Sequence, residues 1–536
     1  MSNENGLTRY ETPPPVDEQS PLLNKHLPNP DNGAAEQQAE DQDVHGTPIA
    51  KEPTTKELVI TLCSIWVGVF LAALDSTVIA TLSAPISTSF NSFTLLSWLA
   101  SAYLIANAAL QPLAGRLTDI FSRRAGLIFS NIFFAAGNLI CGLAKSEWVI
   151  IFGRVVAGME VGPIRHIYVR GIRPRTPPGL GGVFGGWIND VWGWRVAFLV
   201  QVPFVVVSGI LICFTVHIPV KEKNVSRIKR VDFLGAFTLV VTLVLLLLGL
   251  NSGGNVVSWT HPLVLTSLPL SAVFLLIFIY VEDGVVSEPI IPVRLLLNRT
   301  VASACLTNWF TTMSVFALLY YGPIYFQVRG LSTTGAGARL IPQSVGAAVG
   351  SLGSGLIMRA TGRYWLLNAI TEGILVLSFA LVAATFDLNT PAVPPFIYFF
   401  LGGLGYGGML TVTLLALISA VDHEHQAVIT SASYAFRSTG STIGITIASA
   451  VFQNVLKKEL WERFGDRKDA AGVIGRVRDS LDEVRHLPPE WKLGVLETYM
   501  DALRAVWWTM FGISLLGALI SLLMREHVLH KNLARR

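Results

Sequence analysis

Four ionisable residues stand inside long apolar stretches of the sequence and are its first candidates for chemistry: Asp75, Arg154, Glu372 and Arg437. A charge at the centre of a bilayer costs about 2.5–3.5 kcal/mol on insertion scales, so such residues usually have a function. A partly desolvated carboxyl at Asp75 is suited to bind and release a proton, and Arg154 is suited to tune a carboxyl. Glu372 is suited to bind a cationic substrate.

Each of these residues also has a structural interpretation. Asp75 could cap a helix or form a structural pair near the membrane face, and Arg154 could be an interfacial anchor with a snorkelling side chain. Glu372, near the end of its apolar stretch, could be hydrated. Arg437 could form a structural pair. The sequence alone leaves these alternatives open.

The composition is that of a polytopic membrane protein. The 536 residues are 51% hydrophobic and 14% charged, whereas soluble domains carry about a quarter charged residues. A net charge of +4 in short clusters excludes a nucleic-acid partner. The four cysteines have neither disulfide nor metal-ligand spacing. Because the sequence shows no catalytic Ser/His/Asp set and no nucleotide-binding loop, we expect no enzyme, no ATP-driven pump, no metal and no cofactor.

The apolar stretches predict an all-α fold, because only helices satisfy backbone groups in lipid without closing a barrel. Twelve stretches are long enough to span a bilayer: 57–82, 94–113, 125–144, 196–217, 232–250, 262–281, 301–326, 336–358, 365–386, 395–421, 428–453 and 503–524. Between 144 and 196 two further spans are damaged: 148–163 begins a span but runs into Glu160 and the basic, Pro-bearing stretch 165–178, and 179–188 is typical of the second half of another span.

The distribution of Lys and Arg sets the predicted topology. Basic residues gather in the loops after the second span, before 232, between 358 and 365, and after 524. The positive-inside rule places all these loops, and both termini, in the cytoplasm. The segment 455–500 has balanced charges and is predicted on the non-cytoplasmic face.

The tail 1–55 is polar and predicted to be disordered. It contains Glu18 and the pair Leu22-Leu23, in a stretch that resembles the acidic dileucine signal read by sorting adaptors on vacuolar cargo. An accidental leucine pair is the alternative.

The loop from Gly115 to Arg124 carries the most informative motif. Gly115 permits close helix approach, Asp119 can cap a helix or pair with arginines, and Arg123 and Arg124 follow. A purely positive anchor would explain the arginines but not the glycine and the aspartate. This loop resembles the signature loop between spans 2 and 3 of the major facilitator superfamily, with Ser122 where that family usually has glycine.

Other motifs narrow the resemblance to fourteen-span drug:proton antiporters. Asp75 lies in a stretch similar to their first-span motif, and Arg154 matches an arginine linked there to proton coupling. A glycine-rich stretch resembles the end of their fifth-span antiporter motif, without its usual proline: Gly181, Gly182, Gly185 and Gly186. The resemblance covers about 57–525.

This resemblance implies an architecture of two six-helix bundles plus two extra central spans. The expected organisation is a tail at 1–55, an N-terminal bundle at 57–217, cytoplasmic loops with the extra spans at 218–300, a C-terminal bundle at 301–525, and a tail at 526–536. Substrate would bind between the bundles near the midplane, and one bundle would rock against the other. A monomer is the default expectation.

The amino-acid sequence of the spans most resembles that of fungal vacuolar basic amino acid transporters. This implies that the chain, in the vacuolar membrane, moves Lys, Arg or His from cytosol to vacuole in exchange for protons. The first alternative is proton-coupled efflux of drugs or toxins at the plasma membrane. The second is a non-transporting receptor, or an inactive product of a faulty gene model, because 159–178 is typical of a translated intron or an out-of-frame join.

Overall fold

The structure is a computed structural model, and it describes most of the chain after residue 54. The described ranges are 55–92, 95–120, 123–160, 180–215, 232–253, 257–286, 293–422, 425–467 and 469–527. The predicted tail 1–55 with Glu18, Leu22 and Leu23, and nearly all of the 159–178 stretch, lie outside them.

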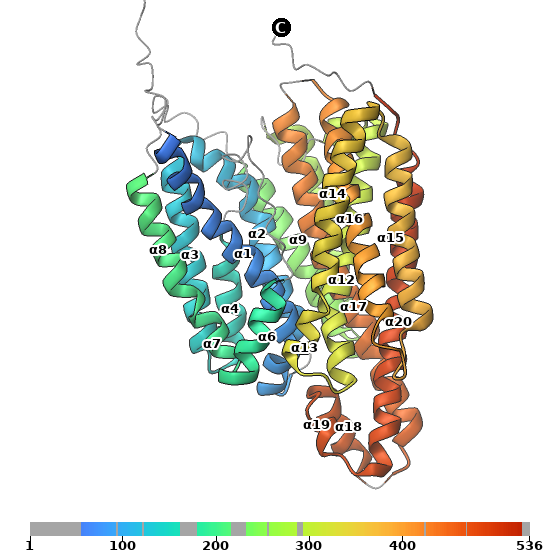
Figure 1. Ribbon diagram of the computed structural model, residues 1–536. Coiled ribbons are helices and arrows are strands. Elements are labelled where there is room, and N and C mark those ends of the chain that lie inside the picture. The colour runs from blue at the N-terminus through green and yellow to red at the C-terminus, as the bar shows by residue number, and fades with distance from the viewer. Residues whose placement is uncertain are drawn as a thin grey trace, which may run out of the picture. The chain divides into compact units, whose positions relative to one another are not determined.

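Seven helices of the N-terminal bundle lie in the described residues. They are α1 (Thr55–Ser89), α2 (Leu95–Ile120), α3 (Arg123–Leu143), α4 (Glu147–Gly158), α6 (Leu180–Trp192), α7 (Trp194–Leu199) and α8 (Gln201–Thr215). Figure 1 shows α1, α2, α3 and α8 running side by side, with α6 and α7 near their lower ends.

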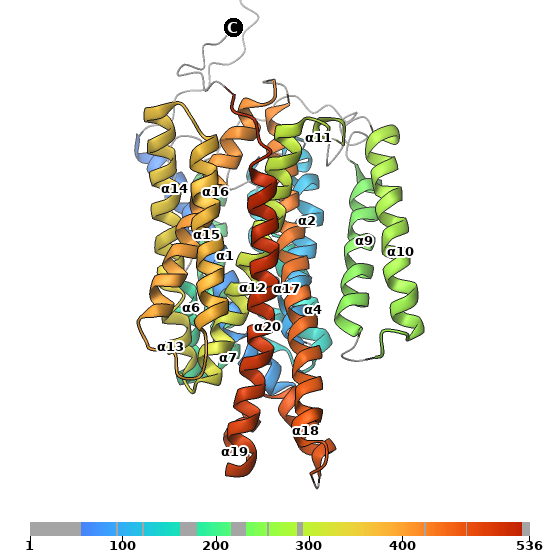
Figure 2. The ribbon, with the colours of Figure 1, turned by 90° about the vertical axis from the view of Figure 1, so that its right-hand side faces the viewer.

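Two helices between the bundles confirm the extra spans. They are α9 (Phe233–Ser252) and α10 (Pro262–Tyr280), the second followed by the π-turn η2 (Val281–Val285). Asp232 caps α9 by accepting a 2.6 Å hydrogen bond from the Gly235 N–H. Figure 2 shows this pair standing beside the bundles, where α9 contacts α2 and α17.

The C-terminal bundle follows the extra pair. Its helices are α11 (Val293–Leu296), α12 (Arg299–Val328), α13 (Thr333–Ala338), α14 (Ile341–Thr361), α15 (Trp365–Thr385), α16 (Pro394–Ser419), α17 (Gln426–Phe464) and α20 (Pro489–Ser521). Two short helices, α18 (Ala470–Asp479) and α19 (Glu483–His486), join α17 to α20. Following the predicted topology, we call the end that carries α18 and α19 the outer end, and the opposite end the cytoplasmic end (Figure 1).

The all-α prediction is confirmed. Apart from a few residues at the helix ends, the described residues of each predicted span lie on one helix or, at 196–217 and 336–358, on two consecutive helices, and ten described helical segments are long and apolar enough to cross a membrane. The only extended pairing in the described ranges is an isolated bridge between Gly253 and Val257. Many large apolar side chains of α8 and α10 are exposed, as lipid-facing helices require.

Within the described residues, spans 4 and 5 are represented by α4 and α6, on either side of residues 161–179, which lie outside the described ranges. Helix α4 has 12 residues and α6 has 13, which correspond to about 18–20 Å at 1.5 Å per residue, whereas the hydrocarbon core is about 30 Å thick. Both helices belong to the outer part of the N-terminal bundle (Figure 1). Its described residues therefore lack helical cytoplasmic halves for these two spans.

Candidate functional site

Asp75 and Arg154 form a buried ion pair inside the N-terminal bundle. Arg154 Nη1 on α4 donates to Asp75 Oδ2 on α1 over 2.8 Å, and the two side chains are 1% and 0% exposed. Asp75 sits mid-helix, so it does not cap α1, and the burial of Arg154 excludes an interfacial snorkelling anchor. Sequence spacing alone could not reveal this pairing, because 79 positions separate the partners.

The arginine has further partners, whereas one oxygen of the carboxylate has none. Arg154 Nε donates to the Leu99 carbonyl over 3.2 Å, and its guanidinium lies 4.6 Å from the centre of the Tyr103 ring. Asp75 Oδ1 is buried without a hydrogen-bond partner in the described part of the chain. Among the described residues, the pair therefore has one open proton-accepting position.

The glycine motif of α6 packs closely against the turn of α1 that carries Asp75. A Cβ on Gly181 would lie 2.1 Å from Thr77 Oγ1 and 2.4 Å from the Leu74 carbonyl oxygen. A Cβ on Gly185 would lie 3.0 Å from the Val78 methyl carbons. Only glycine permits this approach of α6 to α1.

The other two glycines face the opposite bundle. A Cβ on Gly186 would lie 2.6 Å from the Thr333 carbonyl oxygen. One on Gly182 would lie between the bundles, 3.0 Å from Thr81 Oγ1 of α1 and 3.3 Å from the Gly337 carbonyl oxygen. From the other side, a Cβ on Gly337 would lie 2.1 Å from the Gly182 oxygen. Helix α6 therefore presents one glycine face to α1 and another to α13, and it joins the two bundles.

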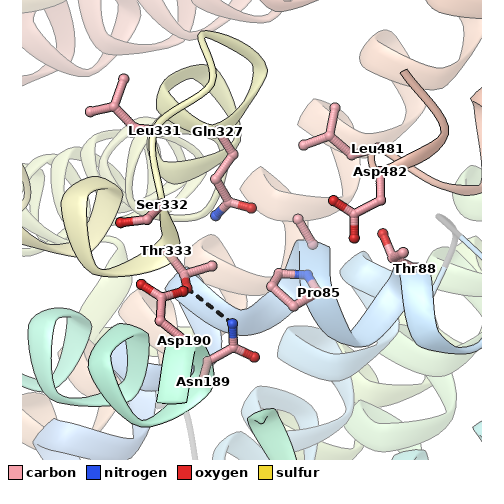
Figure 3. A pocket seen from close by; sticks show the side chains of 11 residues that line it. Pro85, Thr88, Asn189, Asp190, Gln327, Leu331, Ser332, Thr333, Leu481 and Asp482 are labelled. Carbon is pink, nitrogen blue, oxygen red and sulfur yellow. Dashed lines mark hydrogen bonds between the residues drawn. The ribbon is translucent and has the colours of Figure 1, made fainter. Parts of the chain in front are cut away.

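Asp190, which sequence reasoning missed, closes the same contact with hydrogen bonds. Thr334 donates to its Oδ2 from the backbone N–H at 3.0 Å and from the hydroxyl at 2.6 Å. The Thr333 hydroxyl also donates to Oδ1, and accepts a 3.0 Å bond from Asn189 Nδ2, drawn in Figure 3. The signal in the sequence was a carboxylate ending the apolar, glycine-rich stretch.

The pKa of the Asp190 carboxyl lies below its usual value. Partial burial acts against ionisation, but the hydrogen bonds donated by Thr333 and Thr334 outweigh it. The ionised carboxylate is therefore the form that holds this contact.

A cavity of about 210 Å³ lies at the outer end, beside this contact. Both bundles and the α18–α19 segment line it: Ala84, Pro85, Thr88, Asn189, Asp190, Gln327, Leu331, Ser332, Thr333, Leu481 and Asp482. Figure 3 shows Asp190 and Asn189 facing Thr333, with Leu481 and Asp482 nearer Thr88. Gln327 also donates to the Thr81 carbonyl over 3.2 Å. The bundles are thus bonded to each other at their outer ends.

The structure keeps Glu372 and Arg437 apart from the Asp75–Arg154 pair. Glu372 lies well inside α15 and is 1% exposed, so it is not at a solvent-exposed helix end, and it accepts a 3.0 Å bond from the Thr311 hydroxyl. Arg437 on α17 is half-buried, with its guanidinium 5.3 Å from the centre of the Tyr434 ring. Both belong to the C-terminal bundle.

The signature-loop residues lie where α2 ends and α3 begins. Gly115 and Asp119 are in the last turns of α2, and Arg123 opens α3, but their side chains lie outside the described part. Arg124 donates to the Cys213 carbonyl of α8. A gating role for these residues stays a prediction.

The sequence profile of the Major Facilitator Superfamily matches residues 65–166 and 177–445. The chain belongs to this superfamily. The stretch between the two matched segments coincides with the shortened spans 4 and 5. Membership makes the chain a multi-pass membrane transporter of small molecules.

Two similar proteins come from Schizosaccharomyces pombe. "Multidrug resistance protein fnx1" is 35% identical over 88% of this chain and 94% of its own length. "Vacuolar membrane amino acid uptake transporter fnx2" is 33% identical over 82% of this chain and 79% of its own. Among solved structures, an inward-facing bacterial homologue of the human lysosomal transporter Spinster covers 88% of this chain and is itself covered to 98%, with a TM-score of 0.61 and 13% identity. That similarity shows the fold.

Proposed function

We propose that this transporter carries basic amino acids from the cytosol into the vacuole in exchange for protons. The observation that carries the proposal is the buried Asp75–Arg154 pair, in which one carboxylate oxygen has no partner among the described residues. A proton gradient supplies the energy in this scheme, each charge moved being worth about 2.3 kcal/mol per 100 mV.

Protonation of Asp75 would act through the ion pair. A proton on Oδ1 removes the negative charge and leaves Arg154 as an uncompensated buried cation, a situation that costs about 3–5 kcal/mol when one partner of such a pair is removed. The guanidinium must then move or become hydrated. Protonation therefore favours a different arrangement of α1 and α4.

The glycine motif gives this rearrangement a route to the other bundle. Gly181 and Gly185 hold the α1 turn at Leu74–Val78, and Gly182 and Gly186 hold α13. A shift of the Asp75 turn would therefore displace α6 and strain the contact between the bundles at the outer end, where Asp190 bonds to Thr333 and Thr334. With that contact closed, the arrangement suits uptake of substrate from the cytosolic side, and outward release requires it to open.

The described function of one relative supports an amino acid substrate and the vacuolar membrane, and the negative charge of a carboxylate supports a basic amino acid. One relative is described as a vacuolar membrane amino acid uptake transporter, and a carboxylate such as Asp75 suits cationic amino acids. Glu18 with Leu22 and Leu23 would serve as the vacuolar sorting signal. Drug efflux is the competing function, since another relative is described as a multidrug resistance protein.

Uptake into vesicles tests the proposal. Radiolabelled lysine, arginine and histidine are offered to vacuolar-membrane vesicles with and without a proton gradient. Three proteins are compared. The first has the unchanged sequence, the second has spans 4 and 5 completed to about 20 residues each, and the third is the completed protein with Asp75→Asn. We expect gradient-dependent uptake by the completed chain and its loss in Asp75→Asn.

Two other results are informative. Activity in the completed chain alone identifies 159–178 as the defect. Absence of basic amino acid uptake by a correctly inserted completed chain contradicts the proposal, and drug efflux then becomes the function to assay.

A further inference from the structure

A second buried carboxyl, Glu372, has no role in the mechanism above. Its Oε1 accepts one bond from Thr311 of α12, and its Oε2 is buried without a hydrogen-bond partner in the part of the chain that the structure describes. An isolated carboxylate in a low-dielectric interior is very costly unless a cation or several donors compensate it.

Compensating charges are remote from Glu372. Helices α15 and α16 carry no other charged residue. Arg299 opens α12 twelve positions before Thr311, about 18 Å away along the helix. The charged residues of α20 lie between 490 and 504, whereas Gly517 is the α20 residue that faces Thr311. Helix α17, which packs against α12, carries Arg437 and Tyr434, and the Arg437 guanidinium lies over the Tyr434 ring. The remaining titratable groups on these helices include Tyr398 and Tyr406 of α16, the Cys305 thiol of α12 and the Tyr364 phenol before α15.

The polar atoms around Glu372 are incompletely bonded. Asn368, one helical turn before Glu372 and therefore on the same face of α15, has both Nδ2 and Oδ1 buried without partners among the described residues. On α12, Thr307 lies one turn before Thr311, and its hydroxyl is likewise buried and unbonded within the described ranges. Buried polar groups in this state usually bind ordered water.

Asn368 and Thr307, which together we call the lane, lie one helical turn from Glu372 and Thr311 toward the cytoplasmic end. Beyond them lies a buried apolar cluster that includes Val301, Cys305 and Tyr364. Helices α12 and α15 are parallel, because Thr300 at the start of the first and Tyr364 before the second both bond to Arg525. The Thr307–Asn368 layer therefore lies between Glu372 and that end. At the mouth, the Tyr364 hydroxyl donates to the Arg525 carbonyl over 2.6 Å and lies 3.0 Å from His527 Nδ1.

We propose that Glu372 is a second proton-binding site of the transporter, which exchanges its proton with the cytosol through water held at Asn368 and Thr307. On release, the O–H bond of the carboxyl breaks, the proton passes to a lane water as hydronium, and the carboxylate keeps the Thr311 hydrogen bond. The role of this site in transport rests on the proposed proton coupling, but its protonation can be tested without transport.

Infrared difference spectroscopy of the full chain in lipid nanodiscs tests the site. The probe is the proton itself, followed by the C=O stretch of protonated carboxylic acids as the pH is stepped. We expect a band that disappears at high pH, is absent in Glu372→Gln and is retained in Asp75→Asn. A band unchanged in Glu372→Gln, or no titrating band attributable to Glu372 at any pH, overturns the proposal.

A matched pair of threonine variants separates a proton site from a structural carboxyl. Thr311→Val removes the donor to Glu372, whereas Thr371→Val removes a hydroxyl that bonds to the Asn368 carbonyl of its own helix. We expect Thr311→Val to shift the pH midpoint of the Glu372 band and Thr371→Val to leave it in place. Equal effects of the two variants contradict the proposal.

The lane is tested by exchange kinetics. Asn368→Leu should slow the deuterium-induced shift of the Glu372 band severalfold after transfer to heavy water, with little change in its pH midpoint. An exchange rate equal to that of the parent contradicts the proposed route. Because the Glu372 band is followed without transport, whereas the role of Asp75 is tested by vesicle uptake, failure of this site and failure of the proposed function are distinguishable.

Discussion

The two bundles contain buried carboxyls in opposite environments. Asp75 in the N-terminal bundle faces an arginine at 2.8 Å. Glu372 in the C-terminal bundle faces one threonine hydroxyl at 3.0 Å. The first carboxyl sits on a helix turn held by α6, which also contacts the other bundle, whereas the second lies inside its own bundle. Protonation of Asp75 is therefore suited to move one bundle against the other, whereas Glu372 is suited to hold a proton without such a movement.

The largest expected effect comes from breaking the pair. Arg154→Leu leaves the Asp75 carboxylate buried and uncompensated, so we expect a loss of about 3–5 kcal/mol in the free energy of unfolding. Denaturant unfolding of the purified protein in detergent measures it. Asp75→Asn combined with Arg154→Leu should recover much of the loss; a double variant no more stable than Arg154→Leu would show that the pair does not carry this energy.

A smaller effect is expected at the contact between the bundles. Gly337→Ala places a Cβ 2.1 Å from the Gly182 oxygen, an overpacking that typically costs about 1–3 kcal/mol. Opening of the outer end is measured by labelling Thr88→Cys with a membrane-impermeant maleimide in a background without the native cysteines. We expect faster labelling in Gly337→Ala.

The matched control lies in the same short helix. A Cβ on Gly335 meets its nearest atom at an ordinary 3.5 Å, so Gly335→Ala should label like the parent. If both variants label alike, the glycine contact does not keep the outer end closed.

Glu372 should behave unlike Asp75 in the unfolding experiment. Glu372→Gln keeps an acceptor for Thr311 and removes no ion pair, so we expect a change of less than about 1 kcal/mol in the free energy of unfolding. Asp75→Asn leaves the buried Arg154 guanidinium without its counter-charge, so it should lower the free energy of unfolding several times more. Similar losses of unfolding free energy for the two variants would contradict the difference between a paired carboxyl at Asp75 and an isolated one at Glu372.

The smallest effect is a pH dependence at Asp190. Because its pKa is lowered in the closed contact, ionised Asp190 favours closure above the usual aspartate pKa of about 3.9, and this contribution is lost as the pH falls through the lowered value. The side chain is exposed, so its contribution is below about 1 kcal/mol. Because the thiolate is the reactive form and its fraction falls with pH, labelling of Thr88→Cys is expressed relative to that of a free thiol at each pH, and this relative rate should rise on acidification.

In Asp190→Asn, labelling should start higher and lose this pH response. An unchanged response in that variant would assign the titration to another group.

The sequence predicted the helices better than the contacts between them. Runs of about 20 apolar residues form helices in lipid because a helix satisfies all backbone groups internally, so the twelve full spans, including the two extra central ones, could be predicted. The candidates Asp75 and Arg154 could be named from their cost in a bilayer. Their pairing could not, because it depends on how α1 and α4 are rotated and set in depth.

Asp190 was missed for a related reason. It lies at the end of α6, near the edge of the apolar stretch, where a carboxylate is inexpensive and no bilayer penalty marks it. Its importance comes from Thr333 and Thr334, more than 140 positions away. The glycines were recognised, but the two faces they form became visible only once α1 and α13 were in place.

The sequence by itself determined that this protein is a helical transporter of the major facilitator type, because hydropathy, charge asymmetry and short motifs act locally along the chain. Only the tertiary structure decided which buried charge is paired and which is isolated. Electrostatic energy in a low-dielectric interior depends steeply on the separation of side chains, and that separation is set by helix packing.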